Sequence, residues 1–386
     1  MPPLTIDREF LTETLAGLIR INSINPSLVP GAPGEAEIAA YIAGVLRRIG
    51  LHVATHEAEP GRTSVVGTLN GTGGGRSLML NAHVDTVDIA GMPEPFSAAL
   101  RDGKMFGRGA YDMKGSVAAC LAAAKALADA RALLRGDLFI AAVADEEYAS
   151  IGTADLLRHY HPDAAIVTEP TELALCLAHK GFLWLEVETF GRAAHGSRFD
   201  EGIDANMRMG RFLAELDKLE HELRARPPHP LVGPPSLHAA MIQGGSGLST
   251  YAARCTLRIE RRTIPGETEA QVVNEIQSIL NRLSPADPTF KASLKTLLVR
   301  DAFEVSPDAA IVRAVRQSAT EVLGHAPKMT GQTPWMDSAL FAAAGIETVV
   351  IGPAGAGAHS AEEWVDLDSV AALARILAQT AQSFCQ

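Results

Sequence analysis

The sequence predicts an α/β fold in two parts: a larger domain whose sheet is covered by helices on both faces, and a smaller α+β domain inserted into it. Length is the first reason, because 386 residues exceed what one small hydrophobic core usually holds. The outer parts of the chain alternate continuous apolar runs with helical patterns, which is typical of strands buried on both faces. The middle part alternates apolar and polar residues one by one, which is typical of strands exposed on one face.

The composition limits the classes of function. A hydrophobic content of 47% with 20% charged residues is ordinary for a globular protein, and a net charge of -11 argues against nucleic acid or an anionic membrane as partner. The first residues lack the pattern of a signal peptide, and no apolar run is long enough to cross a bilayer. The four cysteines are far apart in the sequence, so we expect free buried thiols and a cytoplasmic location.

The elements of the larger domain follow from periodicity and from turn residues. The segment 64–86 is interpreted as two strands joined by a glycine-rich hairpin loop at 71–75, which lacks the Lys-Ser/Thr ending of a phosphate-binding loop. The end of the chain, from Ile346, predicts a strand, a glycine-rich loop and a closing helix. Further helices are expected at 7–21, 35–49 and 114–131, and buried strands at 137–147 and 164–170.

The middle of the chain predicts a strand-helix-strand-strand-helix-strand order. That order fits a ferredoxin-like domain, with a four-stranded sheet and two helices on one face. We therefore expect an inserted domain at 181–298, and a larger domain made of 1–180 and 299–386. The strands are expected at 181–197, 235–245, 253–264 and 289–299, and the helices at 203–225 and 267–283.

Polar residues suited to metal binding stand where the buried strands end. His83 and Asp85 are two positions apart in an extended segment, so their side chains can point the same way. Ligands of open α/β sheets collect at the carboxyl ends of strands, and two imidazoles with several carboxylates suit a pair of zinc ions or another divalent metal. The other candidates are Asp112, Glu146, Glu147, Glu169 and His359.

Each of these residues, taken alone, could have a structural role without binding metal. Any one acid could be a solvated loop residue, and Glu146 and Glu147 could stand at a helix N-terminus for dipole reasons. His359 could cap the last helix. Several such coincidences at the ends of buried strands are much less probable than one.

Several motifs together resemble a known family: the metallopeptidases that include acetylornithine deacetylase, succinyl-diaminopimelate desuccinylase, aminoacylase and glutamate carboxypeptidase. The resemblance covers nearly the whole chain and implies a zinc-peptidase-like catalytic domain with a mixed sheet, plus an inserted lid and dimerisation domain. The segments that carry it are "NAHVDTVD", "GRGAYDMKGS", "ADEEYASIGT", "VTEPTE", "GRAAHGS", "RRTIPGE" and "GAHSAEEWV".

The resemblance implies a role for each candidate in a centre of two zinc ions, for which cobalt can substitute. Glu146 would be the general base that activates the metal-bridging water, and Asp85 would sit behind His83 and fix its tautomer. Asp112 would bridge the two ions and precede a cis peptide bond to Met113. The remaining ligands would be His83 and Glu169 on one ion, and His359 and Glu147 on the other.

The inserted domain would contribute substrate-binding residues. His195 matches a lid histidine that stabilises the tetrahedral oxyanion, often across a dimer interface, and Arg262 matches an arginine that binds a substrate carboxylate. Family members often carry Asn-Val-Ile-Pro where this chain has residues 249–252, so Ser249 either replaces the asparagine or indicates a different substrate. Gly355, in the glycine-rich loop before His359, is a further candidate.

Alternatives are open here too. His195 could be an ordinary surface residue, and Arg262 could only pair with an acid such as Glu267. Arg258 and Arg261 are expected at the surface. Trp335 could line an apolar pocket or pack in the core.

The expected function is metal-dependent hydrolysis of an amide bond in an N-acyl amino acid, or in a short peptide-like substrate with a free carboxylate. A homodimer is the expected assembly. The alternative within the same class is a dipeptidase or carboxypeptidase, which would share the metal site and differ in the pocket. A non-enzymatic binding protein is the alternative from another class, and Glu146 argues against it because a binding module needs no base.

Overall fold

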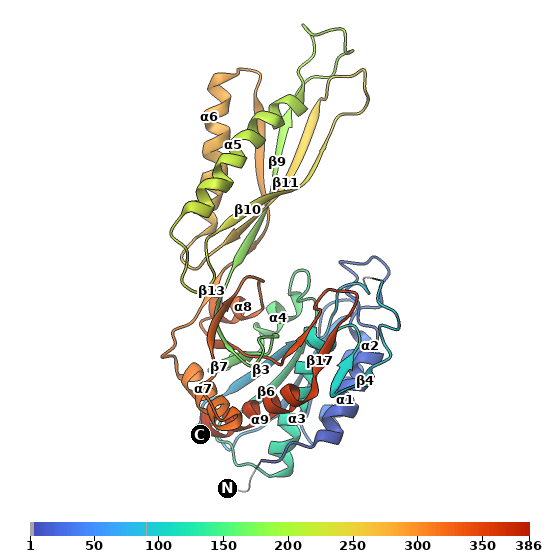
Figure 1. The fold of residues 1–386 in the computed structure, drawn as a ribbon, viewed down its shortest axis with the longest axis vertical. Helices are drawn as coiled ribbons and strands as arrows, with labels where there is room; N and C mark the ends of the chain where they lie inside the picture. Colours follow the sequence, from blue (N-terminus) through green and yellow to red (C-terminus); the bar gives the residue numbers. More distant parts are fainter. Residues whose placement is uncertain (1–3, 90) are drawn as a thin grey trace. The chain divides into compact units, whose positions relative to one another are not determined.

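The computed structural model describes residues 4–89 and 91–386, and the chain divides into two compact units (Figure 1). The first unit comprises Met1–Leu177, Val305–Thr330 and Met336–Gln386. The second comprises Ala178–Glu304 and Gly331–Trp335, so it includes a short segment that the predicted inserted domain omitted.

A mixed sheet forms the centre of the first unit, as predicted. Its four inner strands run parallel in the order β6-β3-β7-β15, while β1, β2 and β8 are antiparallel to their neighbours. β8 continues into the second unit, where β13 (Phe303–Glu304) pairs with its last residues, and β14 (Met329–Gln332) also pairs with β8. The strands are β1 (His52–Glu59), β2 (Arg62–Leu69), β6 (Leu138–Val143), β3 (Leu78–His83), β7 (Ala164–Val167), β15 (Glu347–Val350) and β8 (Leu175–His179).

Helices cover both faces of this sheet. Successive residues of a strand point to opposite sides, so residues of one strand contact helices on both faces. On β2, Gly67 faces Leu46 of helix α2, whereas Ser64 faces Gly152 of helix α4. The alanine-rich helix α3 packs against α1 and α9, and almost all of its residues are buried. The helices of the unit are α1 (Arg8–Arg20), α2 (Ala36–Arg48), α3 (Gly115–Asp129), α4 (Ile151–Leu156), α7 (Ala310–Leu323), α8 (Ser338–Ala343) and α9 (Leu367–Phe384).

A second, small sheet and one irregular turn complete the first unit. The sheet has the order β16-β17-β5-β4, and the turn η1 (Ala110–Lys114) leads directly into α3. The strands are β16 (Gly355–Ala356), β17 (Trp364–Asp366), β5 (Lys104–Phe106) and β4 (Ala99–Arg101).

The predicted hairpin in the segment 64–86 is wrong. β2 and β3 are not neighbours, because β6 lies between them and pairs with both. The glycine-rich loop instead wraps around the chain that enters β6, where the amide of Thr72 donates to the carbonyl of Leu134 and that of Gly73 to Arg135. The approach is so close that a Cβ atom at Gly136 would lie 1.9 Å from the carbonyl oxygen of Arg76.

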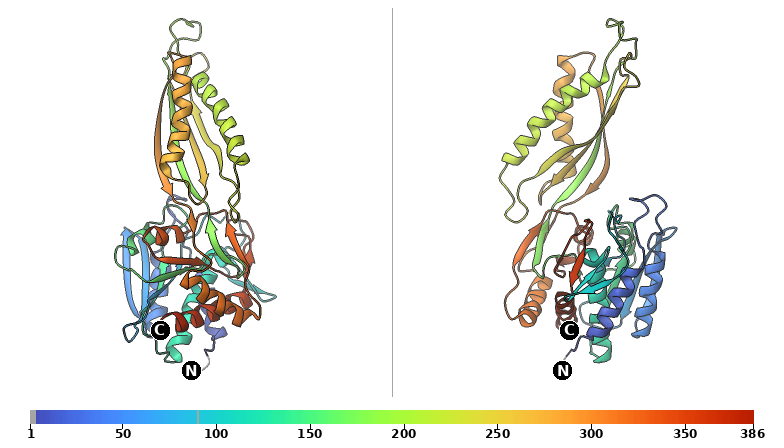
Figure 2. Two further views of the ribbon diagram at one scale, coloured as in Figure 1. Left: turned by 90° about the vertical axis from the view of Figure 1, so that its left-hand side faces the viewer. Right: turned by 45° about the vertical axis from the view of Figure 1, so that its right-hand side comes forward.

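The second unit has the predicted order of elements. Its four strands form an antiparallel sheet in the order β10-β11-β9-β12, and both helices lie on one face of it (Figure 2). The elements are β9 (Gly181–Phe190), α5 (Ala205–Ala225), β10 (Ser236–Gly244), β11 (Arg254–Thr263), α6 (Glu269–Ala286) and β12 (Lys291–Arg300).

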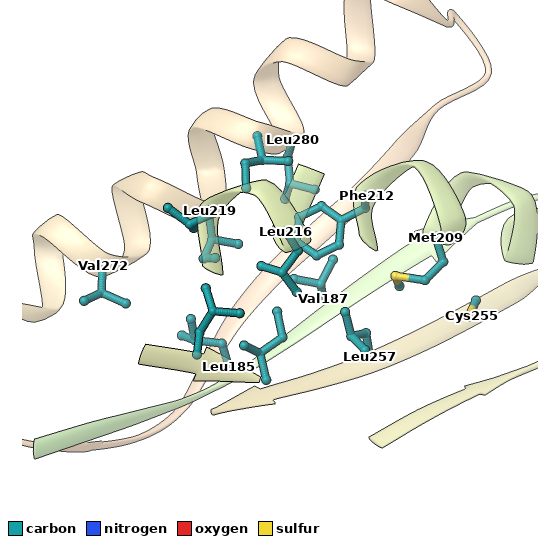
Figure 3. Close-up of a cluster of buried hydrophobic side chains, with 14 of the residues drawn as sticks. Leu185, Val187, Met209, Phe212, Leu216, Leu219, Cys255, Leu257, Val272 and Leu280 are labelled. Carbon is teal, nitrogen blue, oxygen red and sulfur yellow. The ribbon is translucent and has the colours of Figure 1, made fainter. Parts of the chain in front are cut away.

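The core of the second unit lies between the sheet and its two helices. Leu185 and Val187 of β9 and Leu257 of β11 point toward apolar residues of α5 such as Phe212 and Leu216 (Figure 3). Burying a Leu, Val or Phe side chain of this kind stabilises the fold by about 1.5–3 kcal/mol. The amphipathic patterns in the middle of the chain therefore produce a core of their own.

Arg261 contradicts its predicted surface position. Odd-numbered residues of β11 face the helices, so Arg261 points into the core and is fully buried. Its guanidinium pairs there with Glu267 and with Glu275 of α6. Arg258, on the opposite face, is 54% exposed and pairs with Glu186, in agreement with the prediction.

Trp335 takes part in packing within the second unit. Its ring lies edge-on to His179 and to Phe182, and its Nε1 donates a hydrogen bond to the carbonyl of Asp301 at 3.1 Å. Of the two interpretations of this residue, these contacts favour packing.

Candidate active site

The candidate ligands gather because three parallel strands end at the same edge of the central sheet. His83 is the last residue of β3, Glu146 and Glu147 follow β6, and Glu169 follows β7. Asp112 comes from the turn η1, and His359 from the loop between β16 and β17.

Two groups of ligand atoms share Asp112. In the first, His83 Nε2 lies 3.1 Å from Asp112 Oδ1 and 3.7 Å from Glu169 Oε1. In the second, His359 Nε2 lies 3.3 Å from Asp112 Oδ2 and 3.1 Å from Glu147 Oε2. Asp112 therefore turns one carboxylate oxygen toward each histidine. Either group could hold a metal ion.

The donor set fits a pair of divalent transition metals. Two imidazoles and three carboxylates are the ligands that zinc accepts, and a carboxylate offering one oxygen to each side can bridge two ions. The peptide bond between Asp112 and Met113 is cis, which confirms the prediction at this position. The two histidines differ in access, because the side chain of His83 is 1% exposed and that of His359 is 52% exposed.

The electrostatics show a concentration of negative charge that a cation would relieve. Burial, reinforced by neighbouring carboxylates, raises the pKa of Glu146 and of Glu169 well above the usual range. Burial also raises the pKa of Glu147. The pKa of His359 rises to about 10 because Asp112 and Glu147 accept its hydrogen bonds. Burial opposes the charged form of His83, yet Glu169 and Asp112 outweigh it and raise the pKa of this imidazole.

Asp85 lies behind His83, and its carboxylate is within ion-pair distance of the imidazole, although the main chain of Asp85 makes the closer contact. His83 Nδ1 is 3.0 Å from the main-chain carbonyl oxygen of Asp85 and 3.6 Å from its carboxylate. The carboxylate accepts hydrogen bonds from the amides of Glu146 and Glu147, at 3.1 and 3.2 Å. The main chain and the carboxylate of Asp85 both lie beside the imidazole, and the carboxylate also fixes the segment with the two glutamates.

A buried polar network, which the sequence did not indicate, supports this segment from behind. Asn25 donates to the carboxylates of Asp85 and Asp145, at 2.8 and 3.0 Å. Arg62 donates to Asp145 at 2.6 Å and binds Glu35 through two nitrogen atoms. All five residues are buried. Asp145 itself has a left-handed φ of 70°, and its carboxylate accepts from amides farther along the same turn.

Glu363 supports Asp112 in a similar way and was also missed. Its carboxylate accepts hydrogen bonds from the amides of Gly109, Tyr111 and Asp112, at 2.9–3.0 Å, and from Arg108 at 2.6 Å. Both Glu363 and Arg108 are buried. The acidic pair that follows His359 in "HSAEEW" was the available signal, but only the folded chain brings it to the turn at Asp112.

The candidate substrate residues lie in different places. Gly355 is in β16, where an added Cβ atom would meet the ring of Tyr111 at 2.5 Å, so close packing explains the glycine. His195 and Ser249 lie together in loops of the second unit, where the amide of Gly196 donates to the carbonyl of Ser249 at 2.7 Å. Both residues are exposed, and His195 Nδ1 lies 2.8 Å from Ser197 Oγ.

Arg262 lies at the other end of the sheet in the second unit. It pairs in register with Phe182 at the start of β9, whereas His195 comes after the end of β9 at Phe190. Eight residues of strand span about 26 Å, so Arg262 and His195 of one chain are too far apart to contact the same small substrate. Arg262 Nε donates to Glu260 at 2.7 Å, and its guanidinium lies over the ring of Phe182.

Comparisons with known proteins agree with this architecture. The model of peptidase family M20/M25/M40 matches residues 79–383. N-formyl-4-amino-5-aminomethyl-2-methylpyrimidine deformylase of Bacillus subtilis is 30% identical, with 92% of this chain and 91% of the relative covered. Acetylornithine deacetylase of Myxococcus xanthus is 29% identical, with 84% of each chain covered.

Solved structures share the fold at lower identity. Aminopeptidase PepT from Bacillus cereus superposes with a TM-score of 0.80 at 17% identity, covering 99% of this chain and all of that chain. The metallo-carboxypeptidase Sso-CP2 from Sulfolobus solfataricus has a TM-score of 0.79 at 18% identity, covering 97% and 99% of the two chains. No helix in the described part of the chain has the length and hydropathy that a membrane crossing needs.

Proposed function

Because the chain belongs to peptidase family M20/M25/M40, we propose that it is a zinc-dependent deacylase that hydrolyses the amide bond of a small N-acyl amino acid. One observation carries the proposal: two groups of ligand atoms share Asp112, and Glu146 stands beside them in the chain. The deacylase direction is supported by two relatives that are similar over most of the chain, a deformylase and an acetylornithine deacetylase.

The residues divide the chemistry among them. His83, Asp112 and Glu169 would hold one ion, and Asp112, Glu147 and His359 the other. Bound zinc lowers the pKa of water and polarises a carbonyl oxygen. Glu146 would accept a proton from the attacking water as the oxygen of that water bonds to the carbonyl carbon. It would then hand the proton to the amine nitrogen as the C–N bond breaks. Asp85 keeps Glu146 and Glu147 in place through their amides.

A substrate series tests the proposal. The zinc-loaded protein is expected to hydrolyse N-formyl and N-acetyl amino acids faster than dipeptides. Glu146→Gln should lower kcat/KM by roughly 10²- to 10⁴-fold, the usual contribution of general acid–base catalysis, with the metal content unchanged. Glu9→Gln is the control, because Glu9 is an exposed residue of α1 and is not close in sequence to any of the candidate ligands.

Two outcomes would change the conclusion. Undiminished activity of Glu146→Gln would remove Glu146 as the base. Faster cleavage of dipeptides, or release of C-terminal residues from peptides, would replace the deacylase by a peptidase with the same metal centre.

We further propose a two-fold dimer formed through the second unit. β10 is an edge strand of its sheet, and it exposes Met241 and Ile242, 62% and 57% of whose surfaces are accessible. Edge strands with apolar side chains are templates for pairing with another chain. In such a dimer, His195 of one chain and Arg262 of the other could serve the same substrate, which one chain alone cannot achieve.

Complementation between two inactive variants tests this arrangement. Glu146→Gln and His195→Ala chains are inactivated separately, then mixed and allowed to exchange. If His195 acts across the dimer, each mixed dimer contains one intact site, and about a quarter of the wild-type specific activity should return for random pairing. Failure to recover activity, together with a monomer by light scattering, would place His195 in the site of its own chain or outside any site.

A further inference from the structure

We propose that His56, Asp155 and His159 form another metal-binding site, separate from the candidate active site, that takes a divalent transition metal such as zinc, nickel or copper. The three residues belong to the first unit, and none of them is among the ligands around Asp112. The inference is therefore independent of the proposed deacylase activity.

The three side chains already offer their ligand atoms to a common point. One atom from each residue lies within 4.8 Å of the other two. The imidazole rings of His56 and His159 have centroids 5.0 Å apart at an angle of 32°, and His159 Nε2 lies 4.0 Å from Asp155 Oδ1. A small contraction would bring these atoms to the distances at which zinc binds nitrogen and oxygen, about 2.0–2.2 Å from the ion.

Two separate segments supply the ligands. His56 lies on the edge strand β1, opposite Ser64 of β2. Asp155 lies at the end of α4 and His159 four residues later, where the amide of Tyr160 still donates to the carbonyl of Leu156 as in a helix. Residues four apart on a helical turn face the same side, so Asp155 and His159 can bind one ion together.

The chemistry of the donors favours a transition metal over calcium or magnesium. Two imidazole nitrogens and one carboxylate oxygen are ligands for zinc, copper and nickel, whereas calcium and magnesium prefer oxygen alone. Three protein ligands leave room for water to complete the coordination. The site is open to ions, because the side chain of His159 is 51% exposed and that of Asp155 is 20% exposed.

The surroundings of His56 suit a ligand. The hydroxyl of Tyr160 lies 3.1 Å from Nε2 of His56, and a hydrogen bond to one ring nitrogen commonly orients a metal-binding imidazole. Burial and the neighbouring His159 lower the pKa of His56, which favours the neutral form that binds metal. Arg158 is the competing cation, at 3.7 Å from Asp155, but it is 77% exposed and so holds the carboxylate weakly.

A bound ion would tie β1 to the segment that follows the active-site glutamates. α4 begins at Ile151, a few residues after Glu146 and Glu147, and it packs against β1. An ion that binds only the folded chain raises its stability by mass action. The bound ion would therefore cross-link the edge strand β1 to the α4 region and stabilise their packing.

Metal counting tests the proposal on the full chain. Wild-type protein, His56→Ala and His159→Ala are dialysed against the same free zinc concentration and their metal content is measured. Each variant should hold about one equivalent of zinc less than the wild type. The difference between proteins is the readout, so the number of ions in the candidate active site does not affect the result.

The chain provides a matched control for surface histidines. Asp217 and His221 have the same four-residue spacing on α5, at 4.0 Å, without a second imidazole in their group. His221→Ala should keep the wild-type zinc content, and Arg158→Ala should bind zinc at least as tightly as the wild type. Zinc should also raise the Tm of the wild type more than that of His159→Gln, a second variant that retains a polar side chain.

Equal zinc content in the wild type, His56→Ala and His159→Ala would overturn the proposal. So would an equal loss in His221→Ala, since zinc would then bind any exposed histidine.

Discussion

The ligand cluster of the first unit and the candidate substrate residues of the second are built in different ways. Asp85 and Glu363 are buried acids that hold the main chain of the ligand-bearing turns through several amides. His195 and Ser249 lie in exposed loops, and Arg262 rests on Glu260 and the ring of Phe182. The candidate metal ligands thus have buried support, whereas the candidate substrate residues lie at or near the surface. Mutations in the first region should therefore reduce metal binding or stability strongly, whereas those in the second should have smaller effects that depend on the substrate.

The largest effect is expected at the residue shared by both ligand groups. Asp112→Ala should lose at least one zinc ion, and kcat/KM should fall by roughly 10³-fold or more, because several kcal/mol of carbonyl polarisation are lost with the metal. A chelator should produce the same loss in the wild type. The exposed Asp308→Ala is the control, and elemental analysis is the measurement. Full metal occupancy in Asp112→Ala would contradict the shared ligand.

The next effect concerns the buried network behind Glu146 and Glu147. Arg62→Met leaves Glu35 and Asp145 buried without their cation, and breaking a buried pair in this way costs about 3–5 kcal/mol of unfolding free energy. Arg258→Met removes an exposed pair with Glu186 in the second unit and should cost about 0–1 kcal/mol.

Urea denaturation of both arginine variants measures the contrast. A loss below about 1 kcal/mol for Arg62→Met would be no larger than that of an exposed pair, and would show that the network is not what holds the turn.

The smallest of the three effects is expected at Arg262, and it should depend on the substrate. If Arg262 binds a substrate carboxylate, Arg262→Ala should lower kcat/KM for the free acid by a factor that corresponds to about 1.5–3 kcal/mol of lost binding free energy. The loss for the matched amide should be much smaller. The coupling between the protein change and the substrate change identifies the contact. Equal losses on both substrates would mean that Arg262 serves only its pair with Glu260.

A structural feature can be predicted from this sequence when it depends on neighbouring residues, and not when it depends on residues far apart in the chain. His83, Asp112 and His359 could be identified because their residue types and neighbouring motifs are local signals. The hairpin at 71–75 was wrong because strand neighbours are chosen by the whole sheet, and β6 comes from more than 50 residues later in the chain. The helices and strands themselves could be predicted because hydrophobic periodicity reflects which residues of each segment are buried.

The supporting residues escaped prediction for the same reason. Arg62 and Asp145 are 83 residues apart and Arg108 and Glu363 are 255 apart, so no short pattern joins them. Arg261 is buried, contrary to its predicted surface position. Its burial depends on Glu267 and Glu275, which reach it only in the folded chain. Charged residues in a core can be predicted only when their partners are known.

The unequal exposure of His83 and His359 has a consequence for how the centre would be loaded and emptied. Because solvent reaches His359 more readily than His83, the position at His359 would release its ion first, and the ion beside His83 would be retained longer. The two positions would then be kinetically distinct despite similar donors. Brief dialysis would yield a half-loaded protein, to which a different metal could be added at the vacated position, giving a defined mixed-metal centre.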